Sequence, residues 1–314
     1  MDRQIAVLLP CRNEEVAIAD VVAGFRAALP DAAIYVYDNN STDDTAGRAR
    51  AAGAIVRREE LAGKGNVVRR MFADIEADIY IIADGDGTYD PTQAPEMARR
   101  IADDSIDMVV ATRADEGGEE TYRPGHRAGN RTLTGFVGWL FGARFSDILS
   151  GYRAFSRRFV KSFPALAQGF EIETELTIHA LELRMPVDEI QTRYSARPEG
   201  SASKLSTWRD GFRIFATILF LFKEVRPFRF FGTIFTGLAL LSLALAYPVL
   251  VTFLQTGLVP RLPTAILSMG VMVLAFIALV SGVILDTVSR GRREAKRMHY
   301  LALSSPARPP AKGK

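Results

Sequence analysis

The 314-residue sequence predicts an α/β domain with a three-layer, mostly parallel sheet, followed by a membrane-spanning helical hairpin. Two observations predict this fold class. Over residues 1–205, short apolar segments that suit strands alternate with segments that suit helices, as in parallel sheets flanked by helices. Beyond residue 229, two long stretches carry no charged residue, and each is long enough to cross a bilayer.

The predicted strands are short apolar segments, and the helical segments lie between them. The strands are expected at residues 5–9, 33–37, 54–57, 79–83 and 108–111, and the helices at residues 14–28, 43–52, 63–76 and 92–102. The segment Ile79–Ala83 is apolar, which is typical of a strand buried on both faces. Ligands on parallel sheets bind beyond the carboxyl ends of the strands, so polar residues after the strands are the first candidates for a site.

The membrane hairpin is expected at residues 230–286, with helices at about 230–254 and 264–285. Their 25 and 22 uncharged residues, at about 1.5 Å of rise per residue, can each cross a hydrocarbon core of roughly 30 Å. The preceding segment, 206–229, is expected to form an amphipathic helix on the bilayer surface and a linker, with an ordinary packed helix as the alternative.

The distribution of charge predicts the orientation of this hairpin. Residues 287–314 carry eight Lys or Arg residues and one Glu, whereas the loop between the spans carries only Arg261. By the positive-inside rule, both termini and the α/β domain are expected on the cytoplasmic side of an inner or plasma membrane. A basic segment directly after an apolar span indicates a membrane surface rather than a nucleic acid. The single cysteine, Cys11, excludes an internal disulfide framework and fits a reducing compartment.

Polar clusters follow several predicted strands. Asp84-Gly85-Asp86 comes after the strand at 79–83, and two carboxylates beside a flexible turn suit a divalent cation that carries a nucleotide diphosphate. Three further clusters occupy residues 9–15, 38–45 and 63–66. The last precedes a predicted helix, where backbone N–H groups and Lys64 can meet a phosphate. Each cluster alone could be an ordinary solvated turn, but the ordered set predicts a site.

Together with residues 109–113, 147–153 and 201–204, these clusters resemble the inverting family 2 glycosyltransferases with the GT-A fold, over roughly residues 4–205. The resemblance is to the branch that makes polyprenyl-phosphate sugars, such as dolichyl-phosphate mannose synthases. It implies a GT-A domain over residues 1–205 that moves a hexose from a UDP- or GDP-sugar to polyprenyl phosphate, with Mg²⁺ or Mn²⁺. The product would be a lipid-linked monosaccharide for glycan or lipid modification outside the cytoplasm.

The resemblance also implies roles for individual residues. Catalytic roles fall to Asp86 and to Asp147, as base or as positioner of the acceptor, and the metal would be held by Asp84 and Asp86. The residues implied for the donor nucleotide and its diphosphate are Pro10, Arg12, Glu14, Asp38, Lys64, Asp84, Arg197 and Lys204. Those implied for the acceptor phosphate are Arg113, Arg127 and Arg131. Arginine suits this task because its guanidinium can hold two phosphate oxygens at once.

The sequence departs from the family pattern in three places, and these leave the nucleobase and the sugar open. Arg12 stands where an aromatic residue is common, Asn39 replaces the second Asp of a usual Asp-Asp pair, and Thr88 replaces a Gln of several mannose synthases. Simpler interpretations also exist: Asp147 could cap a turn, and the arginines at 123, 127 and 131 could form one solvated helix face.

Two other functions are compatible with parts of the pattern. A processive polysaccharide synthase of the same fold would carry Gln-x-x-Arg-Trp and more spans, whereas this chain has Trp208-Arg209 in the reverse order and two spans. A non-catalytic scaffold that binds a nucleotide sugar is disfavoured because the residues expected for chemistry are all present, namely Asp84, Asp86, Asp147 and Lys204. A Rossmann dehydrogenase is set aside, because no Gly-x-Gly-x-x-Gly follows the first strand. A homo-oligomer is compatible with the hairpin, whose spans can pack against a partner.

Overall fold

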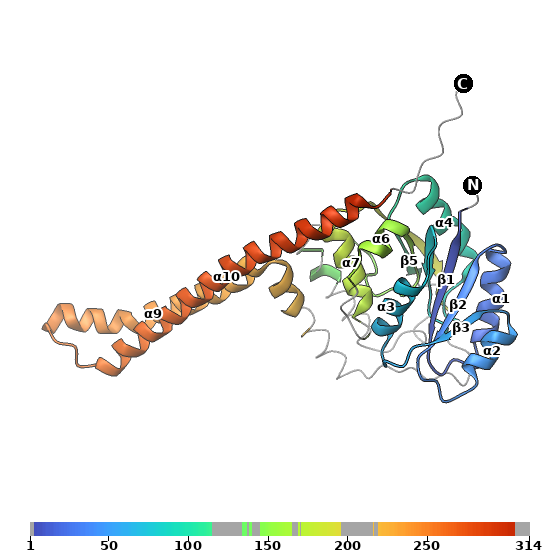
Figure 1. Ribbon diagram of the computed structural model, residues 1–314. Helices are drawn as coiled ribbons and strands as arrows, with labels where there is room; N and C mark the ends of the chain where they lie inside the picture. Colours follow the sequence, from blue (N-terminus) through green and yellow to red (C-terminus); the bar gives the residue numbers. More distant parts are fainter. Residues whose placement is uncertain are drawn as a thin grey trace, which may run out of the picture. The chain divides into compact units, whose positions relative to one another are not determined.

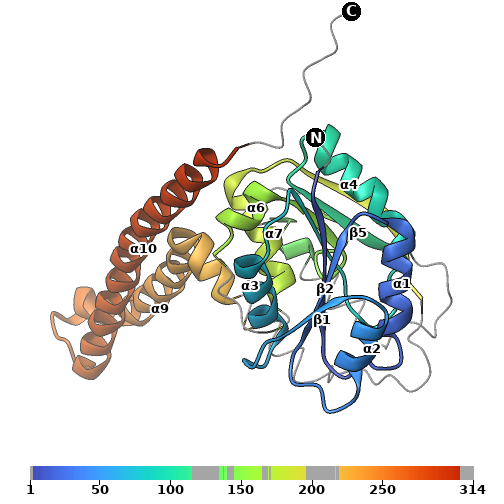
Figure 2. The same cartoon turned by 45° about the vertical axis from the view of Figure 1, so that its right-hand side comes forward.

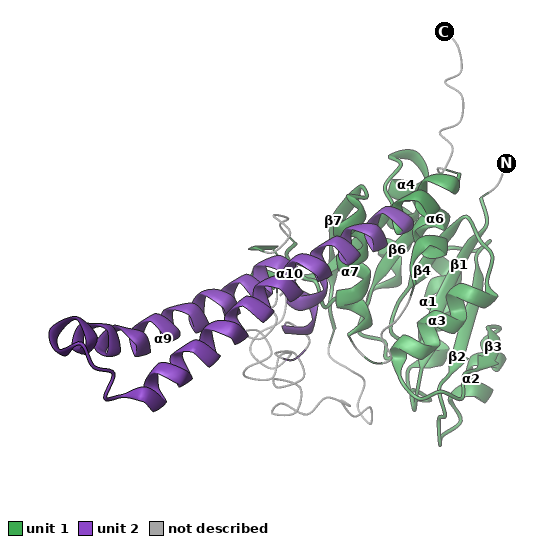
Figure 3. Cartoon of the chain, turned by 60° about the vertical axis from the view of Figure 1, so that its left-hand side comes forward, with its two compact units in different colours: residues 1–214, 296–314 green, residues 215–295 purple. Residues whose placement is uncertain are grey.

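The structure of the protein is a computed structural model, and it describes residues 3–114, 134–136, 138, 139, 145–164, 169, 171–195, 216 and 219–304. The chain divides into two compact units (Figure 3). The first contains residues 1–214 together with the C-terminal segment 296–314, and the second contains residues 215–295.

The first unit is built around a seven-stranded sheet with the strand order β3-β2-β1-β4-β6-β5-β7. The strands are β1 (Ile5–Cys11), β2 (Ala33–Asp38), β3 (Ile55–Arg58), β4 (Ile79–Ile82), β5 (Met108–Ala114), β6 (Arg153–Ser156) and β7 (Val187–Arg193). All neighbours pair in parallel except β6, which runs antiparallel to both β4 and β5. The five predicted strands are therefore confirmed, and β6 and β7 are additional.

Helices cover both faces of the sheet (Figures 1 and 2). One face packs against α1 (Ile18–Ala28), α2 (Thr45–Ala51) and α4 (Ala94–Asp103), the last preceded by the 3-10 turn η1 (Pro91–Gln93). The other face packs against α3 (Lys64–Asp74), α6 (Arg157–Ser162) and α7 (Ile172–Leu183). The predicted three-layer α/β fold is confirmed. Helix α1 begins four residues later than the predicted residue 14, because the carbonyl of Glu14 closes a turn with Ala17 and Ile18 first.

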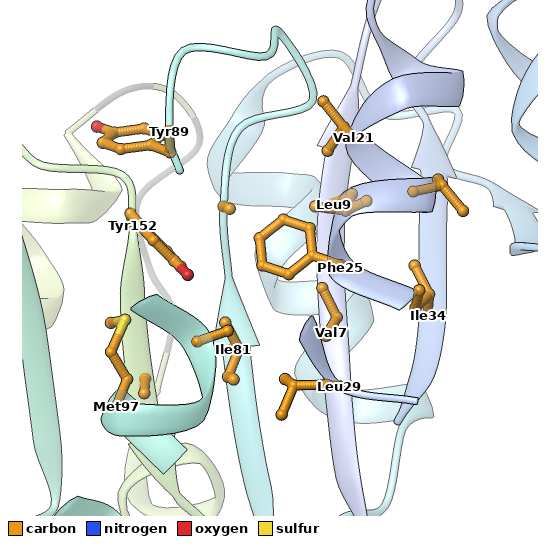
Figure 4. Close-up of a cluster of buried hydrophobic side chains, with 14 of the residues drawn as sticks. Val7, Leu9, Val21, Phe25, Leu29, Ile34, Ile81, Tyr89, Met97 and Tyr152 are labelled. Atoms are coloured by element: carbon orange, nitrogen blue, oxygen red, sulfur yellow. The ribbon is translucent and has the colours of Figure 1, made fainter. Parts of the chain in front are cut away.

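Alternation along the strands divides the core between the two faces. On β1, Val7 and Leu9 face α1, whereas Leu8 belongs to the opposite cluster with α3. Figure 4 shows the first cluster, in which the Phe25 ring of α1 meets Tyr152 edge to face, with 6.0 Å between ring centroids. Because both faces are covered, the functional groups are restricted to the ends of the strands.

The antiparallel direction of β6 determines which segments meet at the carboxyl ends of the parallel strands. Arg153, the first residue of β6, pairs with Ile82 of β4 and with Val110 of β5. The segment that precedes β6, residues 147–152, is therefore placed beside the carboxyl ends of β4 and β5. Sequence patterns cannot reveal this arrangement, because β6 has only four residues and runs directly into α6, which is capped by Ser156.

The C-terminal turns of α10 (Leu262–Ala302) belong to the first unit, where a buried carboxylate holds them. Asp107, which is 0% exposed, accepts hydrogen bonds from Tyr300 Oη at 2.7 Å and from Ser156 Oγ at 2.6 Å. Arg158 donates to both Asp107 oxygens, at 2.5 and 2.7 Å. Residues 287–302 of the predicted basic tail are thus helical, and Tyr300 and its neighbours have fixed partners.

The second unit is a hairpin of α9 (Pro227–Thr256) and α10 (Figure 3). Small buried residues recur every seven positions on α10, at Ser268, Ala275, Gly282 and Ser289. A side chain on Gly282 would bring its Cβ within 2.9 Å of Phe231 Cβ, so the two backbones approach closely there. The outer surface exposes large apolar side chains, including Leu254 and Met269 at 74% and 70%. Both helices are long and apolar enough to cross a membrane. Of the predicted amphipathic segment 206–229, residues 216 and 219–229 are described; residues 219–225 are helical, and α9 begins at Pro227.

We expect the stability of the first unit to fall as the pH drops below 6.5, partly through His179 of α7. Burial, together with the charge of Lys296, lowers the pKa of His179 from 6.5 to about 3. Between these pH values the unfolded chain binds a proton that the folded chain does not, so this residue removes up to about 1.4 kcal/mol of unfolding free energy per pH unit.

Denaturant unfolding of the detergent-solubilised protein between pH 4.5 and 7 measures this effect. His179→Gln should make the dependence of unfolding free energy on pH shallower, whereas the same change at the exposed His299 should leave the slope unchanged. Equal slopes for all three proteins would contradict the assignment.

Candidate active site

The turn after β1 and the turn after β2 are joined by side chain–backbone hydrogen bonds. The backbone N–H of Asn13 donates to Ser41 Oγ at 2.9 Å, and Asn13 Oδ1 accepts from the backbone N–H of Thr42 at 2.8 Å. Glu14 donates its backbone N–H to Thr45 Oγ1 at 2.8 Å. Asn13 has a positive φ of 53°, which asparagine adopts more readily than most residues. These bonds hold Glu14, which is buried, at the edge of the sheet.

The contacts of Asn39 give a physical reason for the asparagine that replaces the second Asp of the usual Asp-Asp pair. Its Nδ2 donates to the carbonyl oxygens of Glu59 and Leu61, both at 2.8 Å, and its Oδ1 accepts from the backbone N–H of Gly63 at 2.8 Å. An aspartate has no N–H group and could make only the last of these bonds. Asn39 therefore anchors the loop that leads into α3, while its neighbour Asp38 stays buried at the end of β2.

Lys64, the first residue of α3, lies between two carboxylates. Its Nζ is 2.5 Å from Asp84 Oδ1 and 2.5 Å from Glu173 Oε1. Burial by itself would lower the pKa of Lys64, but the two carboxylates outweigh it and the pKa is raised. Burial raises the pKa of Glu173, and Lys64 opposes that effect. The sequence marks Lys64 and Asp84 for the nucleotide, but the partnership with Glu173 depends on the packing of α7.

Two glycines allow the chain to pack closely around the acidic turn. A Cβ on Gly151 would lie 2.6 Å from Asp84 Oδ2 and 3.0 Å from Lys64 Nζ. A Cβ on Gly85 would collide with the sulfur of Cys11. The backbone of the segment before β6 thus packs directly against Lys64 and Asp84, which a residue with a side chain at position 151 could not do.

Asp86 is the second carboxylate of the turn after β4, and it is 3% exposed. Thr88 donates to Asp86 Oδ1 through its Oγ1 at 2.7 Å and through its backbone N–H at 3.2 Å. Thr88, which replaces the Gln of several mannose synthases, therefore orients this carboxylate.

The acidic turn fits a divalent metal whose remaining ligands are water molecules and substrate phosphates. Among the described residues, no group of three Asp, Glu, His or Cys side chains could hold an ion. Mg²⁺ takes oxygen ligands, keeps several waters and usually binds through one or two carboxylates and substrate phosphates. Asp86 supplies a fixed carboxylate of this kind, and Asp84 lies one residue away with its Oδ1 engaged by Lys64.

Arg113 and Asp147 form a second ion pair at the same edge. Arg113 donates from Nε to Asp147 Oδ2 at 2.6 Å and from Nη2 to Oδ1 at 2.9 Å, a two-point arrangement that fixes the guanidinium plane. The ring of Tyr194 lies 5.4 Å from the Arg113 Cζ, measured to the ring centroid. Asp147 also accepts the backbone N–H of Leu149 at 3.2 Å, so the expected turn-capping contact is present as well.

Arg153 is a residue to which the sequence alone assigns no role. It is 1% exposed, and it donates to the carbonyl oxygens of Ile148 at 2.6 Å and Ser150 at 2.8 Å, and to Thr177 Oγ1 at 2.8 Å. Burial lowers the pKa of this guanidinium. Through these buried hydrogen bonds, Arg153 holds the turn that carries Asp147 in place. Its signal in the sequence is only the arginine that ends the Asp-Ile-Leu-Ser-Gly-Tyr-Arg segment.

The structure brings several of the predicted site residues to one edge of the sheet. Lys64, Asp84 and Asp86 lie at the end of β4, and Arg113 meets Asp147 at the end of β5. At the ends of β1 and β2 lie Pro10, Arg12, Glu14 and Asp38. Four predicted residues lie outside the described part of the chain, namely Arg127, Arg131, Arg197 and Lys204.

Known proteins resemble this chain in sequence and in fold. The family model described as glycosyl transferase family 2 matches residues 6–162. The glycosyltransferase AglJ of Haloferax volcanii is 33% identical over 309 residues, which cover 95% of this chain and 98% of that protein. A dolichyl-phosphate hexose transferase of the same organism is 28% identical over 222 residues, which cover 71% of this chain and 95% of that protein.

Solved structures show the same fold. Glucosyl-3-phosphoglycerate synthase from Mycobacterium tuberculosis, in complex with Mn²⁺, UDP-glucose and phosphoglyceric acid, matches with a TM-score of 0.56 and 26% identity. The match covers 69% of this chain and 79% of that one, and it confirms the predicted GT-A fold.

We expect Lys64→Met to lower the unfolding free energy by about 3–5 kcal/mol, because it leaves the buried Glu173 and the partly exposed Asp84 without their cation. Adding Glu173→Gln to this variant should restore part of the loss, since one of the two uncompensated charges is removed. Denaturant unfolding of the single and double variants at pH 7.5 measures both effects.

The matched control is Lys223→Met, whose lysine is 41% exposed and 3.7 Å from Glu224, and which should change stability by less than about 1 kcal/mol. A double variant less stable than Lys64→Met alone would show that the three groups do not act as one charge cluster.

Proposed function

Since this chain belongs to glycosyl transferase family 2, we propose that it transfers a hexose from a nucleotide diphospho-sugar to a polyprenyl phosphate at a membrane surface, with inversion. The observation that carries the proposal is the meeting of two sets of groups at one sheet edge. An acidic turn with Asp84 and Asp86 adjoins Lys64, and beside it the segment before β6 presents Asp147 paired with Arg113. The first set suits a diphosphate with its cation, and the second suits a phosphate.

The donor side is assigned to the ends of β1, β2 and β4. Glu14 and Asp38 are buried carboxylates fixed by the interlocked turns, and they suit hydrogen bonds to a nucleobase and a ribose, with Pro10 and Arg12 beside them. The solved relative that holds UDP-glucose and Mn²⁺ supports a nucleotide sugar as donor. UDP and GDP both remain open as carriers.

The metal assignment rests mainly on Asp86, with Asp84 next to it. Mg²⁺ or Mn²⁺, when bound, offsets the negative charge that develops on the departing nucleotide diphosphate. Thr88 holds the Asp86 carboxylate in place, and Lys64 balances Asp84, so the turn does not need to reorganise as charge develops. Arg197 and Lys204 are proposed to reach the diphosphate from the late part of the domain.

The acceptor side is assigned to Arg113, with Arg127 and Arg131. A lipid phosphate is already anionic near pH 7, so strong removal of a proton by a base is not required. The chain must instead bring two anions together, which cationic side chains achieve. Asp147 accepts hydrogen bonds from two nitrogens of Arg113, Nε and Nη2, and this favours a role in positioning the arginine over a role as general base. The relative named as a dolichyl-phosphate hexose transferase supports this acceptor class.

The hairpin of α9 and α10 is proposed to anchor the enzyme in the inner or plasma membrane, with both termini cytoplasmic. Its exposed apolar surface supports membrane insertion, and the charges that flank it support the orientation. A lipid acceptor gives a reason for such an anchor, because the phosphate to be glycosylated lies at the bilayer surface.

Product analysis tests the proposal directly. The purified full-length protein in lipid vesicles is offered a panel of UDP- and GDP-sugars, with polyprenyl phosphate and Mg²⁺ or Mn²⁺. A single lipid-linked monosaccharide is the expected product. A growing glycan would favour a processive synthase, and transfer to added phosphoglyceric acid in preference to the lipid would identify a soluble acceptor.

We expect Asp86→Asn to lower kcat by at least about a hundredfold without loss of folding, because the change removes a charge that faces the metal. Asparagine keeps an oxygen that can accept the hydrogen bond from Thr88. Asp90→Asn is the matched control, since Asp90 caps η1 and asparagine caps as well. Wild-type turnover in Asp86→Asn, or in excess chelator, would refute the metal assignment.

We expect Arg113→Lys to raise KM for polyprenyl phosphate about tenfold and to leave KM for the nucleotide sugar within about twofold. Lysine keeps the charge but cannot reproduce the two-point contact of the guanidinium. Arg99→Lys, on the exposed side of α4, controls for the substitution itself. Steady-state kinetics with each substrate varied in turn separates the two constants, and a larger effect on the donor would reverse the assignment.

A further inference from the structure

The second unit contains a pocket of about 430 Å³ between the start of α9 and the cytoplasmic half of α10. We call it the arginine pocket. Its lining includes Arg226, Phe228, Arg229, Val283, Asp286 and Arg290. The transfer reaction proposed above uses none of these residues, all of which lie within residues 215–295.

The arginine pocket lies where both helices change from apolar to charged. On α9 the uncharged span begins at residue 230, directly after Arg229, and on α10 it ends at residue 285, directly before Asp286. The two ends are neighbours, since a Cβ on Gly282 would lie 3.6 Å from the carbonyl oxygen of Pro227. In a bilayer this level corresponds to the layer of lipid headgroups.

The charge of the arginine pocket favours an anion with a hydrogen-bonding group. Three guanidinium groups and one carboxylate line it, which leaves two net positive charges. The first turn of α9 carries no acidic residue, so the positive end of the helix dipole adds to them. Asp286 Oδ2 is 2.9 Å from both Nε and Nη2 of Arg290, which steadies that guanidinium at the rim.

We propose that the arginine pocket binds the headgroup of an anionic glycerophospholipid. The phosphodiester would lie among the arginines, and a headgroup hydroxyl would donate to Asp286. The acyl chains would leave along Phe228 and Val283 into the bilayer. A polyprenyl phosphate suits the pocket less well, because a monoester carries no further donor for Asp286. The inference rests on the membrane anchoring in the proposed function but on no step of the transfer reaction.

Native mass spectrometry of the full-length protein in detergent, without nucleotide sugar, tests the proposal. Phosphatidylglycerol should bind, and Arg229→Gln and Arg290→Gln should each weaken its binding about fivefold. Both arginines are exposed, with the Arg290 side chain at 71%, so their replacement does not endanger folding. Arg261→Gln, in the loop at the other end of the hairpin, is the matched control and should have no effect.

The headgroup assignment has its own test. Phosphatidylmethanol has the same charge as phosphatidylglycerol but no hydroxyl, and the wild-type protein should prefer phosphatidylglycerol. Asp286→Ala should abolish this preference. Equal lipid binding by the wild type and the Arg229 and Arg290 variants would overturn the proposal, as would retention of polyprenyl phosphate that phosphatidylglycerol does not displace. If the protein failed to transfer a sugar, the lipid-binding measurements would still stand. A protein that stays soluble without detergent would instead refute the membrane anchoring on which this inference rests.

Discussion

Lys64 places one positive charge between two carboxylates that come from distant parts of the chain, Asp84 after β4 and Glu173 in the first turn of α7. Lys64 and Glu173 are largely removed from bulk water, so each stabilises the charge of the other, and the partly exposed Asp84 is the second carboxylate beside the Lys64 charge. The contact therefore ties α3, the acidic turn and α7 together at the edge of the sheet. The hydrogen bonds of Asn39 hold the loop before α3, and so they also help to fix the position of Lys64.

The second constraint is the direction of β6. A parallel strand between β4 and β5 would place its carboxyl end at the functional edge, but the antiparallel β6 places its amino end there. The segment 147–152 consequently reaches Asp84 through Gly151 and Arg113 through Asp147. Arg153 donates hydrogen bonds to two carbonyl groups of this segment and so helps to hold it in place. The proposed donor and acceptor sides are thereby joined through one short segment of the chain.

The two units differ in the environment that their surfaces suit. The first unit buries its apolar side chains on both faces of a sheet and keeps its charges at the strand ends. The second exposes large apolar side chains over two long helices and gathers arginines where the uncharged spans end. We proposed above that lipid covers this surface. In these two proposals each unit recognises a phosphate-bearing lipid, at Arg113 in the first and at the arginine pocket in the second.

The sequence by itself determined the five parallel strands, the helices between them, the two apolar spans and the acidic turn, because each depends on local periodicity and on residues close in the chain. It also marked Lys64, Arg113 and Asp147 individually. The tertiary structure alone decided their partners: Glu173 for Lys64, Arg113 for Asp147, and the carbonyl groups of the 148–150 turn for Arg153. These contacts join residues that lie far apart in the chain or depend on β6, whose four residues carry too little pattern to reveal its direction. Charge pairing across a sheet edge follows from strand order and direction, which local patterns do not encode.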